Sequence, residues 1–577
     1  MRSTHRTSLR LRAAMVGIGF GLLLTAIGAK AFYVQVMRSP WLSEKASGQY
    51  TSAMTMEGKR GSIFDTRMRE LAASIEVTSI VAYPARLADP RAAAVALART
   101  LGFKPAALHR KLTAGKSFAW IKRQATPREV EAVRALALPG VGFIPEHRRF
   151  YPNRHLAAQV IGFAGIDGNG LEGLEFYYDA QLRAKEATFT VLRDALGRGF
   201  ASEERPWTVE SGNNLILTID QTIQFIAEKA LAEAVQTQGA KSGMALVMDP
   251  KTGALLAIAH VPTFNPNVFE RSPRYHWRNR AITDPFEPGS TMKIFSVAAA
   301  IESGGLTSQS ILFCENGAYQ IGKNVVHDTK GHGWLSIEQI IKYSSNIGAV
   351  KVGEKVGPAA LFRTLHDFGF SSRTGIDCPG ETAGNLAPYR KWAKIDAGTI
   401  AFGQGISVSA LQLVSAVSVI ANGGMLMRPH LVRAITDARG RTVQDFPPTP
   451  IRRVISDRTA SVVTRMMQAA VSTGSTGTRA SLAGYSVCGK TGTAQKSGVG
   501  GGYAPDRYIA SFVGFVPARR PVLTILVVVN EPQHDHYGGS VAAPVFRKIA
   551  HEALDYLDVP PEGGNNLMVY RQQEVQG

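Results

Sequence analysis

The chain has 577 residues, of which 45% are hydrophobic and 19% charged, and Lys plus Arg exceed Asp plus Glu by 20. This length predicts two or three domains rather than one, and the composition excludes a disordered protein. The positive charge suits an anionic lipid or polymer surface. Because the sequence has no aromatic-interleaved RNA motif and no zinc-finger spacing, we expect no nucleic-acid partner.

The N-terminus has the pattern of a membrane anchor. Residues 1–12 are basic, and an apolar run follows at 13–29. At 1.5 Å per residue this run reaches about 25 Å, and residues 30–34 extend it towards the ~30 Å of a bilayer core. Positive charge before such a span keeps the N-terminus in the cytoplasm. We predict a cytoplasmic segment 1–12, a single transmembrane anchor at 13–34 and export of the rest.

A cleaved signal peptide is the alternative to an anchor. The tripeptide Ala29-Lys30-Ala31 is similar to a signal-peptidase site, and cleavage there would make Phe32 the first residue of the mature protein. The apolar run is longer than the hydrophobic region of a typical signal peptide, which favours the anchor.

Residues 58–206 are predicted to form a non-catalytic domain. Residues 77–83 have the pattern of a strand, and residues 91–101 and 127–136 have that of helices. No cluster of catalytic side chains stands out in this part of the chain. The polar residues 210–214 then predict a hinge.

Residues 211–560 alternate predicted strands and helices. A Pro-Lys-Thr-Gly turn between two β-rich runs predicts a hairpin, and a proline-flanked link joins two later strands. The predicted elements are strands at 245–248, 254–259, 508–515 and 523–529 and a helix at 542–557. The final residues, 561–577, predict a loose tail.

The cysteines indicate neither a metal site nor a disulfide framework. Cys314, Cys378 and Cys488 lie far apart and form no C-x-x-C pair. We expect small, mostly buried thiols, although one disulfide is compatible with the count. We expect no metal and no other cofactor.

Ser290-Thr291-Met292-Lys293 is the most informative segment of the chain. Pro288 and Gly289 precede it, and the apolar run 294–301 predicts a buried helix behind it. Residues three apart on a helix share one face, so the lysine amine is expected near the serine hydroxyl. Burial lowers the pKa of a lysine, and a serine nucleophile needs such a base.

Two further motifs follow in order. Ser344-Ser345-Asn346 comes after a helical pattern at 336–343, and Lys490-Thr491-Gly492-Thr493 comes after a predicted strand at 485–489. S-x-x-K, S-x-N and K-T-G in this order form the motif set of penicillin-binding proteins and serine β-lactamases. Considered without the other two motifs, Ser344 is also typical of a helix cap. All three motifs in order make chance a poor explanation.

Over residues 58–560 the sequence resembles class B penicillin-binding proteins, in particular the FtsI-type, division-specific peptidoglycan D,D-transpeptidases. Besides the three motifs, the matching segments are 60–65, 149–152, 170–175, 217–220, 249–253, 403–405 and 537–539. The resemblance implies an α+β protein. A membrane anchor and an elongated mixed pedestal at 58–206 precede a transpeptidase domain at 211–560. That domain has an antiparallel five-stranded sheet with helices on both sides and a helical subdomain.

The resemblance also implies the chemistry. Ser290 attacks the carbonyl of a D-alanyl-D-alanine stem peptide, and an amine of another stem then takes the acyl group. Lys293 acts as the base, Ser344 relays a proton and Asn346 holds the substrate amide. The hydroxyls of Thr491 and Thr493 bind the terminal carboxylate, with Lys490 as the positive charge, and Gly492 is a further substrate-binding position.

Location and partners follow from the same resemblance. The catalytic domain is expected outside the bacterial cytoplasmic membrane, with β-lactams as covalent inhibitors and a multi-span glycan polymerase and other division proteins as partners. A septal role is favoured because Ser345, Ile347, Gly348 and Ala349 follow the division pattern, whereas elongation-specific relatives carry acidic and aromatic residues there.

Three alternatives stay open: an elongation-specific transpeptidase, a β-lactamase and a non-catalytic penicillin-binding receptor or scaffold. A β-lactamase needs a group that activates water, and Glu381 with Asn385 has a suitable spacing. However, Pro379-Gly380-Glu381 also matches the penicillin-binding pattern, and a secreted hydrolase needs neither anchor nor pedestal. A scaffold does not need the catalytic side chains, which this chain retains.

Overall fold

A computed structural model of the chain describes residues 4–193, 199–200, 210–498 and 502–562. By its internal contacts the chain divides into two compact units. One consists of Met1–Gly58 with Ala184–Glu210, and the other of Lys59–Arg183 with Ser211–Gly577. Most of the predicted tail, from residue 563 onwards, lies outside the described residues.

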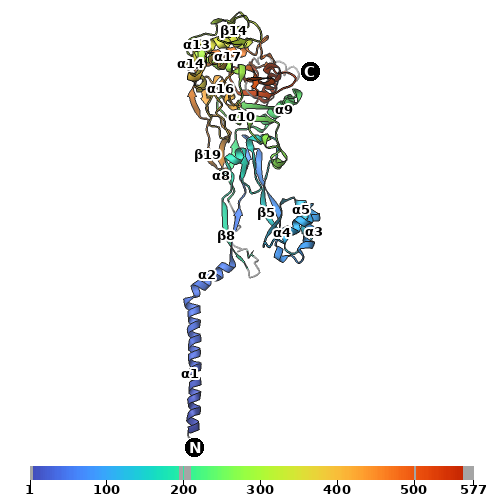
Figure 1. Cartoon of the computed structure of the whole chain (residues 1–577), viewed down its shortest axis with the longest axis vertical. Coiled ribbons are helices and arrows are strands. Elements are labelled where there is room, and N and C mark those ends of the chain that lie inside the picture. The colour runs from blue at the N-terminus through green and yellow to red at the C-terminus, as the bar shows by residue number, and fades with distance from the viewer. Residues whose placement is uncertain (1–3, 194–198, 201–209, 499–501, 563–577) are drawn as a thin grey trace, which may run out of the picture. The chain divides into compact units, whose positions relative to one another are not determined.

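The first unit contains the predicted anchor. Helix α1 (Thr4–Phe32) is followed by the π-helical turn η1 (Tyr33–Met37) and helix α2 (Ser39–Tyr50) (Figure 1). Within the described residues, Ser8–Met37 is the one helical stretch long and apolar enough to cross a membrane, and its large apolar side chains are exposed. The unit ends in an antiparallel sheet of β1 (Thr51–Glu57), β8 (Glu186–Arg193) and β9 (Gly199–Phe200).

A five-stranded antiparallel sheet organises the C-terminal part of the second unit, as predicted. Its order is β12-β11-β23-β22-β21. The strands are β11 (Ser242–Met248), β12 (Leu255–Val261), β21 (Cys488–Ser497), β22 (Tyr503–Val516) and β23 (Leu523–Asn530). The strand expected at 485–489 begins only at Cys488, so the K-T-G motif lies within β21 rather than after it.

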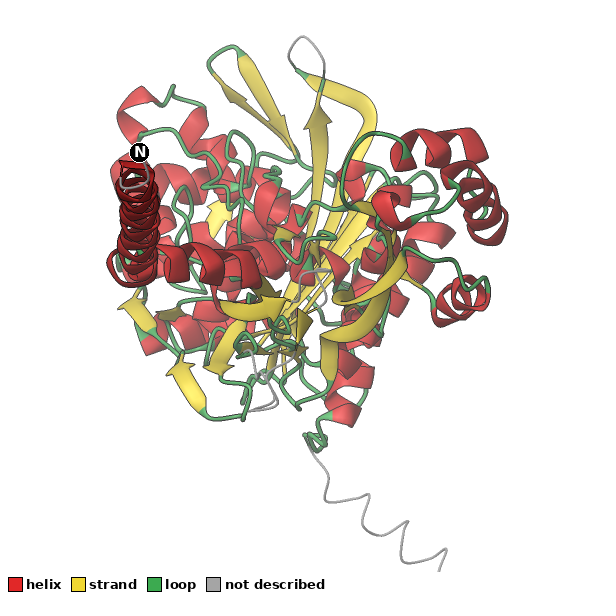
Figure 2. Cartoon of the chain, turned by 90° about the horizontal axis from the view of Figure 1, so that it is seen from below, coloured by secondary structure: helices red, strands yellow, loops and turns green. Residues whose placement is uncertain are grey.

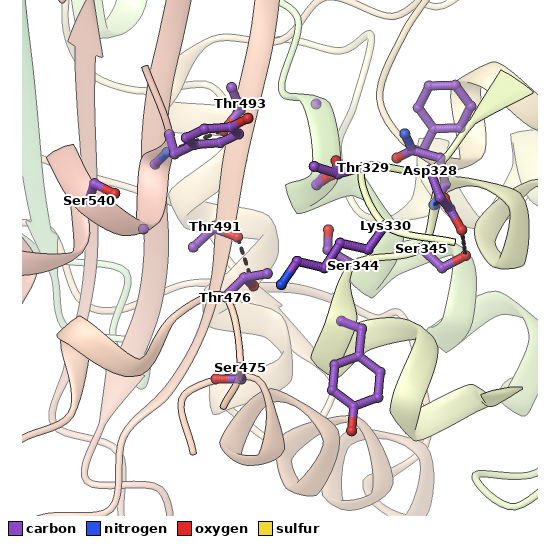
Figure 3. A pocket seen from close by; sticks show the side chains of 18 of the residues that line it. Asp328, Thr329, Lys330, Ser344, Ser345, Ser475, Thr476, Thr491, Thr493 and Ser540 are labelled. Carbon is purple, nitrogen blue, oxygen red and sulfur yellow. Dashed lines mark hydrogen bonds between the residues drawn. The ribbon is translucent and has the colours of Figure 1, made fainter. Parts of the chain in front are cut away.

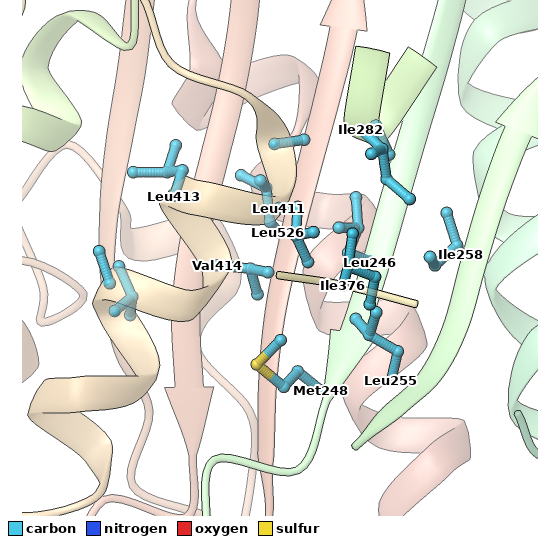
Figure 4. Packing of buried hydrophobic residues seen from close by; sticks show 14 of the residues in the cluster. Leu246, Met248, Leu255, Ile258, Ile282, Ile376, Leu411, Leu413, Val414 and Leu526 are labelled. Atoms are coloured by element: carbon cyan, nitrogen blue, oxygen red, sulfur yellow. The ribbon is translucent and has the colours of Figure 1, made fainter. Parts of the chain in front are cut away.

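Both faces of this sheet are buried under helices (Figure 2). Side chains of a strand alternate between the faces, so Leu246 and Leu526 point to one core while Val247 and Val527 point to the other. The helices on the first face are α10 (Arg280–Thr283), α11 (Lys293–Glu302) and α16 (Ala410–Ala421), and those on the second are α9 (Gln221–Thr237) and α19 (Ala543–Tyr556). Figure 4 shows Leu411 and Val414 of α16 against Leu246 and Leu526.

Local capping explains where several of these helices begin. Ser409 and Gln412 form a capping box at α16, and Asp220 accepts from the backbone N–H groups of Thr222 and Ile223 at α9. These contacts satisfy N–H groups that have no partner within the helix.

A helical subdomain packs beside the sheet around its own core. It contains α12 (Ile337–Tyr343), α13 (Asn346–Val356) and α17 (Asp457–Ala469). Small hairpins border it: β13 (Ile311–Phe313) with β16 (Trp334–Ser336), and β14 (Ala318–Ile321) with β15 (Asn324–His327). Other helices of this region are α14 (Pro358–Asp367) and α15 (Asp396–Ala401), and β17 (Met425–Met427) pairs with β20 (Pro450–Arg453).

The pedestal strands belong to a second, seven-stranded sheet. Its order is β19-β18-β10-β2-β3-β4, and β5 also pairs with β3. The strands are β2 (Ile63–Phe64), β3 (Glu70–Ala82), β4 (Ala119–Ala125), β5 (Val141–Phe150), β10 (Asn214–Leu217), β18 (Val432–Thr436) and β19 (Thr442–Asp445). Because β18 and β19 come from the C-terminal part, one sheet joins the two parts of the second unit.

A small helical lobe lies beside β5 (Figure 1). Its helices are α3 (Pro90–Leu101), α4 (Pro105–Leu112) and α5 (Pro127–Ala135), which share a core with β3 and β4. The remaining short elements of the pedestal are α6 (Ala158–Ile161), β6 (Phe163–Ala164), β7 (Gly170–Glu172), α7 (Gly173–Tyr177) and α8 (Asp179–Leu182).

Three of the pedestal segments that carried the family resemblance meet at one buried carboxylate. Glu175 is fully buried and forms ion pairs with Arg60 Nε at 2.7 Å and Arg149 Nε at 2.6 Å. Tyr151 Oη donates to the same carboxylate at 3.2 Å, and Arg60 also pairs with Asp179 at 2.6 Å. Burial raises the pKa of Glu175, but Arg149 and Arg60 outweigh it and the pKa is lowered. These segments therefore build a charge-compensated core.

Candidate active site

The three catalytic motifs meet at one pocket of about 640 Å³. Ser290, Ser344, Asn346, Thr491 and Thr493 all line it, although they come from segments far apart in the sequence. Figure 3 shows Ser344 facing Thr491 and Thr493 across the pocket. The lysines of the S-x-x-K and K-T-G motifs are fully buried behind this wall.

Ser290 lies in the 3₁₀ turn η5 (Gly289–Met292), which leads into α11 at Lys293. The sequence predicted an α-helical spacing here, and the observed 3₁₀ turn brings residues three apart even closer to one face. Gly289 has a φ of +56°, and its N–H donates to the carbonyl of Gly403 at 3.2 Å. A Cβ on Gly403 would lie 2.1 Å from the carbonyl oxygen of Gly289. Residues 403–405 therefore support the nucleophile turn.

Lys293 is held by the S-x-N motif. Its Nζ lies 2.5 Å from the carbonyl oxygen of Ser344, 2.8 Å from Asn346 Oδ1 and 3.1 Å from Ser344 Oγ. Burial lowers the pKa of Lys293 well below its ordinary value, and the charge of Lys490 lowers it further, while Asp328 opposes both. The site therefore favours a neutral amine at this position.

Ser344 connects the two lysines. Its Oγ lies 3.1 Å from Lys293 Nζ and 3.0 Å from Lys490 Nζ. Ser344 ends α12 with a φ of +64°, a left-handed conformation that is uncommon for a residue other than glycine. Burial also lowers the pKa of Lys490, to about 7.

The residues after Ser344 are fixed by a carboxylate from another segment. Ser345 Oγ donates to Asp328 Oδ2 at 2.6 Å, and the backbone N–H groups of Asn346 and Ile347 donate to Asp328 Oδ1, the second at 3.1 Å. Asn346 Nδ2 donates to the carbonyl of His327 at 2.9 Å. Figure 3 shows the bond between Ser345 and Asp328.

The K-T-G strand approaches η5 closely because Gly492 has no side chain. A Cβ there would lie 2.3 Å from Ser511 Oγ and 2.9 Å from the carbonyl oxygen of Pro288. The threonines on either side are oriented by other loops. Thr491 Oγ1 donates to Thr476 Oγ1 at 3.1 Å, and Thr493 Oγ1 accepts from the N–H of Gly538 at 3.1 Å.

The structure brings together all eight site residues predicted from the sequence. Five of them line the pocket, and the two lysines are buried behind it. Gly492 lies where β21 contacts η5. Sequence reasoning did not find Asp328, Thr476 or Glu287. Glu287 accepts from Gly405 N at 3.1 Å and from Tyr503 Oη at 3.0 Å. Asp328 and Thr476 lie at least 14 residues from the nearest motif, and Pro288 and Gly289 separate Glu287 from Ser290, so no helical or strand pattern connected these residues to the motifs.

Glu381, the residue expected to activate water in a β-lactamase, does not line the pocket. Its carboxylate accepts from Thr374 N and Thr374 Oγ1, both at 2.6 Å, and from Gly375 N at 3.2 Å. The backbone of Asn385 pairs with Ser407. Both residues stabilise turns.

The three cysteines are buried and free, as expected from their spacing. Cys488 lies two residues before Lys490 of the K-T-G motif, and burial raises its thiol pKa well above the ordinary value.

Comparison with known proteins agrees with this geometry. Residues 243–551 match the penicillin-binding protein transpeptidase domain, and residues 55–217 match the penicillin-binding protein dimerisation domain. The chain is 35% identical over 556 residues to the probable peptidoglycan D,D-transpeptidase PenA of Neisseria meningitidis, covering 95% of this chain and 93% of PenA. It is 31% identical over 585 residues to the peptidoglycan D,D-transpeptidase FtsI of Escherichia coli, covering 99% and 97%.

A solved structure has the same fold. Penicillin-binding protein 3 of Mycobacterium tuberculosis, in complex with aztreonam, superposes with a TM-score of 0.70 at 29% identity and covers 88% of this chain and 98% of its own. The chain matches both domains in order, its relatives align over nearly their full length, and its three motifs meet at one pocket. The chain therefore belongs to the class B penicillin-binding proteins and is a peptidoglycan D,D-transpeptidase.

Proposed function

We propose that Ser290 is the acylated nucleophile and Lys293 its base. The observation that carries this proposal is the position of Ser344 Oγ between the two lysine amines, at 3.1 and 3.0 Å. A neutral Lys293 has two N–H bonds, which suffice for the Ser344 carbonyl and Asn346 Oδ1. Its lone pair then remains to accept the proton of a hydroxyl.

Acylation forms the bond between Ser290 Oγ and the penultimate D-alanine carbonyl carbon and breaks the peptide bond to the terminal D-alanine. Lys293 takes the hydroxyl proton, and Ser344 passes a proton to the leaving amine. The acceptor amine of another stem then attacks the ester, loses its proton and restores the Ser290 hydroxyl. Backbone N–H groups of Ser290 and Thr493 form the oxyanion hole, where one donor contributes about 10²–10³ in rate.

Lys490, Thr491 and Thr493 bind the terminal carboxylate of the donor stem. Lys490 keeps its proton below a pH of about 7, and its charge is one of the causes that lower the pKa of Lys293. Asn346 holds the substrate amide, and Gly492 lets the strand reach η5. A β-lactam occupies the same position and leaves Ser290 acylated.

Intact-protein mass spectrometry with penicillin tests this assignment. We expect one stable adduct on Ser290, absent in Ser290→Ala. Rapid loss of the adduct would indicate a β-lactamase, which the position of Glu381 disfavours. Acylation without cross-linking of stem peptides would indicate the receptor or scaffold.

We further propose that the enzyme acts at the division septum. The small and aliphatic residues Ile347, Gly348 and Ala349 after the S-x-N motif support this role, as does the similarity to FtsI. The alternative is side-wall elongation. Depletion in the native cell distinguishes the two: filaments with unsplit septa are expected, and rounded cells would establish the elongation role instead.

The proposal includes the topology and the domain boundaries. Residues 1–12 are cytoplasmic, 13–34 span the membrane, 58–206 form the pedestal and 211–560 the periplasmic transpeptidase domain. The exposed apolar surface of α1 supports a span that binds lipid and pairs with a multi-span glycan polymerase. N-terminal sequencing of the mature protein tests retention of the anchor, because a start at Phe32 would mean cleavage.

A further inference from the structure

The short connection between α12 and α13 needs support that its own residues do not provide. Only Ser344 and Ser345 separate the two helices, and Ser344 is held in the left-handed region with a φ of +64°. Such a conformation is strained and persists only where the surroundings determine it. In the proposed mechanism this turn carries the proton relay, so its support bears directly on catalysis.

Asp328 provides that support from outside the turn. Its two carboxylate oxygens accept three hydrogen bonds, from Ser345 Oγ and from the N–H groups of Asn346 and Ile347. The start of α13 already has an N-cap, because Ser345 Oγ accepts from Gly348 N at 2.9 Å. Asp328, brought in from beyond β15, accepts from the N–H groups of the first two residues of α13, so this helix start depends on a residue outside its own segment.

Asp328 is itself fixed in place. Its N–H donates to the carbonyl of Gly317 at 3.1 Å, and the carbonyl of the preceding His327 accepts from Asn346 Nδ2 at 2.9 Å. The carboxylate is half-buried and lines the pocket beside Thr329 and Lys330 (Figure 3). The end of the β14–β15 hairpin thus clamps both the backbone and the side chain of the S-x-N motif.

We propose that Asp328 is a positioning residue for acyl transfer, which holds the Ser344–Asn346 turn against Lys293 and supplies a negative charge that acts on Lys293. This inference rests on the proposed roles of Ser290 and Lys293. The hydrogen bonds of the Asp328 carboxylate go to Ser345, Asn346 and Ile347, so it acts through the turn and through its charge.

The charge has a consequence that a purely structural residue lacks. Burial and Lys490 lower the pKa of Lys293, and Asp328 raises it. The other charged or titratable groups facing this region are Lys490 on β21, Cys314, the pair of Glu315 with Lys351, and Lys330 and His332 on the same loop. Removing the carboxylate charge is therefore expected to lower the pKa of Lys293 further.

The experiment measures the rate of Ser290 acylation by a fluorescent penicillin as a function of pH, with the full-length protein in detergent. Asp328→Asn keeps an acceptor for the backbone N–H groups but removes the charge. Because Lys293 must be neutral to accept a proton, the acidic limb of the profile should move to lower pH. Asp328→Ala also removes the hydrogen bonds, and a displaced relay should slow acylation by roughly 10²-fold.

Glu354→Gln is the matched control, because it removes one exposed carboxylate from α13, the helix whose start Asp328 holds, and should change neither the rate nor the profile. Thermal unfolding of each variant checks folding. If Asp328→Ala does not fold, the profile of Asp328→Asn decides alone.

Two outcomes would overturn the inference: an acidic limb that stays in place in Asp328→Asn, or wild-type rates in Asp328→Ala. Either leaves the proposed function intact. Labelling of Ser290→Ala in the same assay would instead refute the proposed nucleophile, whatever Asp328 does.

Discussion

The second unit buries two groups of cations, one in the pedestal and one behind the pocket, and they differ in whether a carboxylate lies between them. Arg60 and Arg149 share the buried Glu175 at 2.7 and 2.6 Å. Lys293 and Lys490 share a serine hydroxyl at 3.1 and 3.0 Å, and among the described residues no carboxylate forms an ion pair with either lysine.

We expect the pedestal cluster to contribute to stability and the lysine pair to contribute to reactivity. An arginine stays protonated in a protein, and a carboxylate between two arginines keeps its charge, so all members are compensated. A buried lysine without an anion loses its proton more readily and becomes a base. The pedestal cluster is therefore expected to hold the fold together, whereas the lysine pair reduces stability and provides chemistry. Four experiments test this contrast.

The largest effect is expected for Ser290→Ala, which removes the group that the lysine pair activates. Covalent labelling by a fluorescent penicillin should be abolished, while the unfolding temperature stays close to that of the wild type. The matched control is Ser308→Ala, which changes a half-buried serine of the same domain that does not line the pocket and should label normally. Persistent labelling would show that the lysines serve another nucleophile.

Lys293→Ala should slow acylation by about 10²–10⁴-fold, the usual contribution of a general base. Lys490→Arg keeps a permanent charge for the substrate carboxylate and should lose less. Stopped-flow acylation of the two variants makes the comparison. Equal rates near that of the wild type would contradict the division of roles between the two lysines.

Arg149→Met tests the pedestal cluster. It breaks the ion pair with the buried Glu175 and should destabilise the protein by about 3–5 kcal/mol, as expected when one partner of a buried pair is removed. The folded fraction should acylate at nearly the wild-type rate. The surface pair of Arg123 with the exposed Asp167 offers a control, because Asp167→Asn should cost less than about 1 kcal/mol.

Lys490→Met is the corresponding substitution behind the pocket, and it should change the free energy of unfolding in the opposite direction to Arg149→Met. Replacing an uncompensated buried amine by an apolar chain should stabilise the fold by about 1–2 kcal/mol while acylation is lost. The pKa of Lys490 falls from 10.5 to about 7 on folding. The free-energy cost of burying the protonated amine is therefore absent above a pH of about 10.5 and complete below a pH of about 7. Urea unfolding should therefore show the largest gain below pH 7 and a shrinking gain as the pH rises.

A destabilised Lys490→Met would mean that the lysine pair, like the pedestal cluster, is compensated in the folded state. The contrast between the two groups would then fail, although the assignment of Ser290 would be unaffected.

Much of the fold was predictable because its signals are local. The apolar runs over β11 and β23 and over α11 and α16 are too continuous to be exposed. Turn residues separate β11 from β12, and Pro544 lies in the first turn of α19, where a helix tolerates proline. The beginning of β21 was misplaced by three residues, because its pairing with β22 rather than its own sequence sets where it starts.

The sequence by itself determined the identity and order of the proposed catalytic groups. A serine, two lysines and two threonines in spaced motifs indicate which chemistry these side chains can perform. It also determined the apolar N-terminal helix, whose length and composition suffice. Only the tertiary structure shows that Ser344 lies between the amines of Lys293 and Lys490 and that Asp328 holds the S-x-N turn. Only the tertiary structure shows, in addition, that Glu175 joins three pedestal segments. Hydrogen bonds and charge interactions act over a few ångströms in space, whatever the separation along the chain, so only folding brings these partners together.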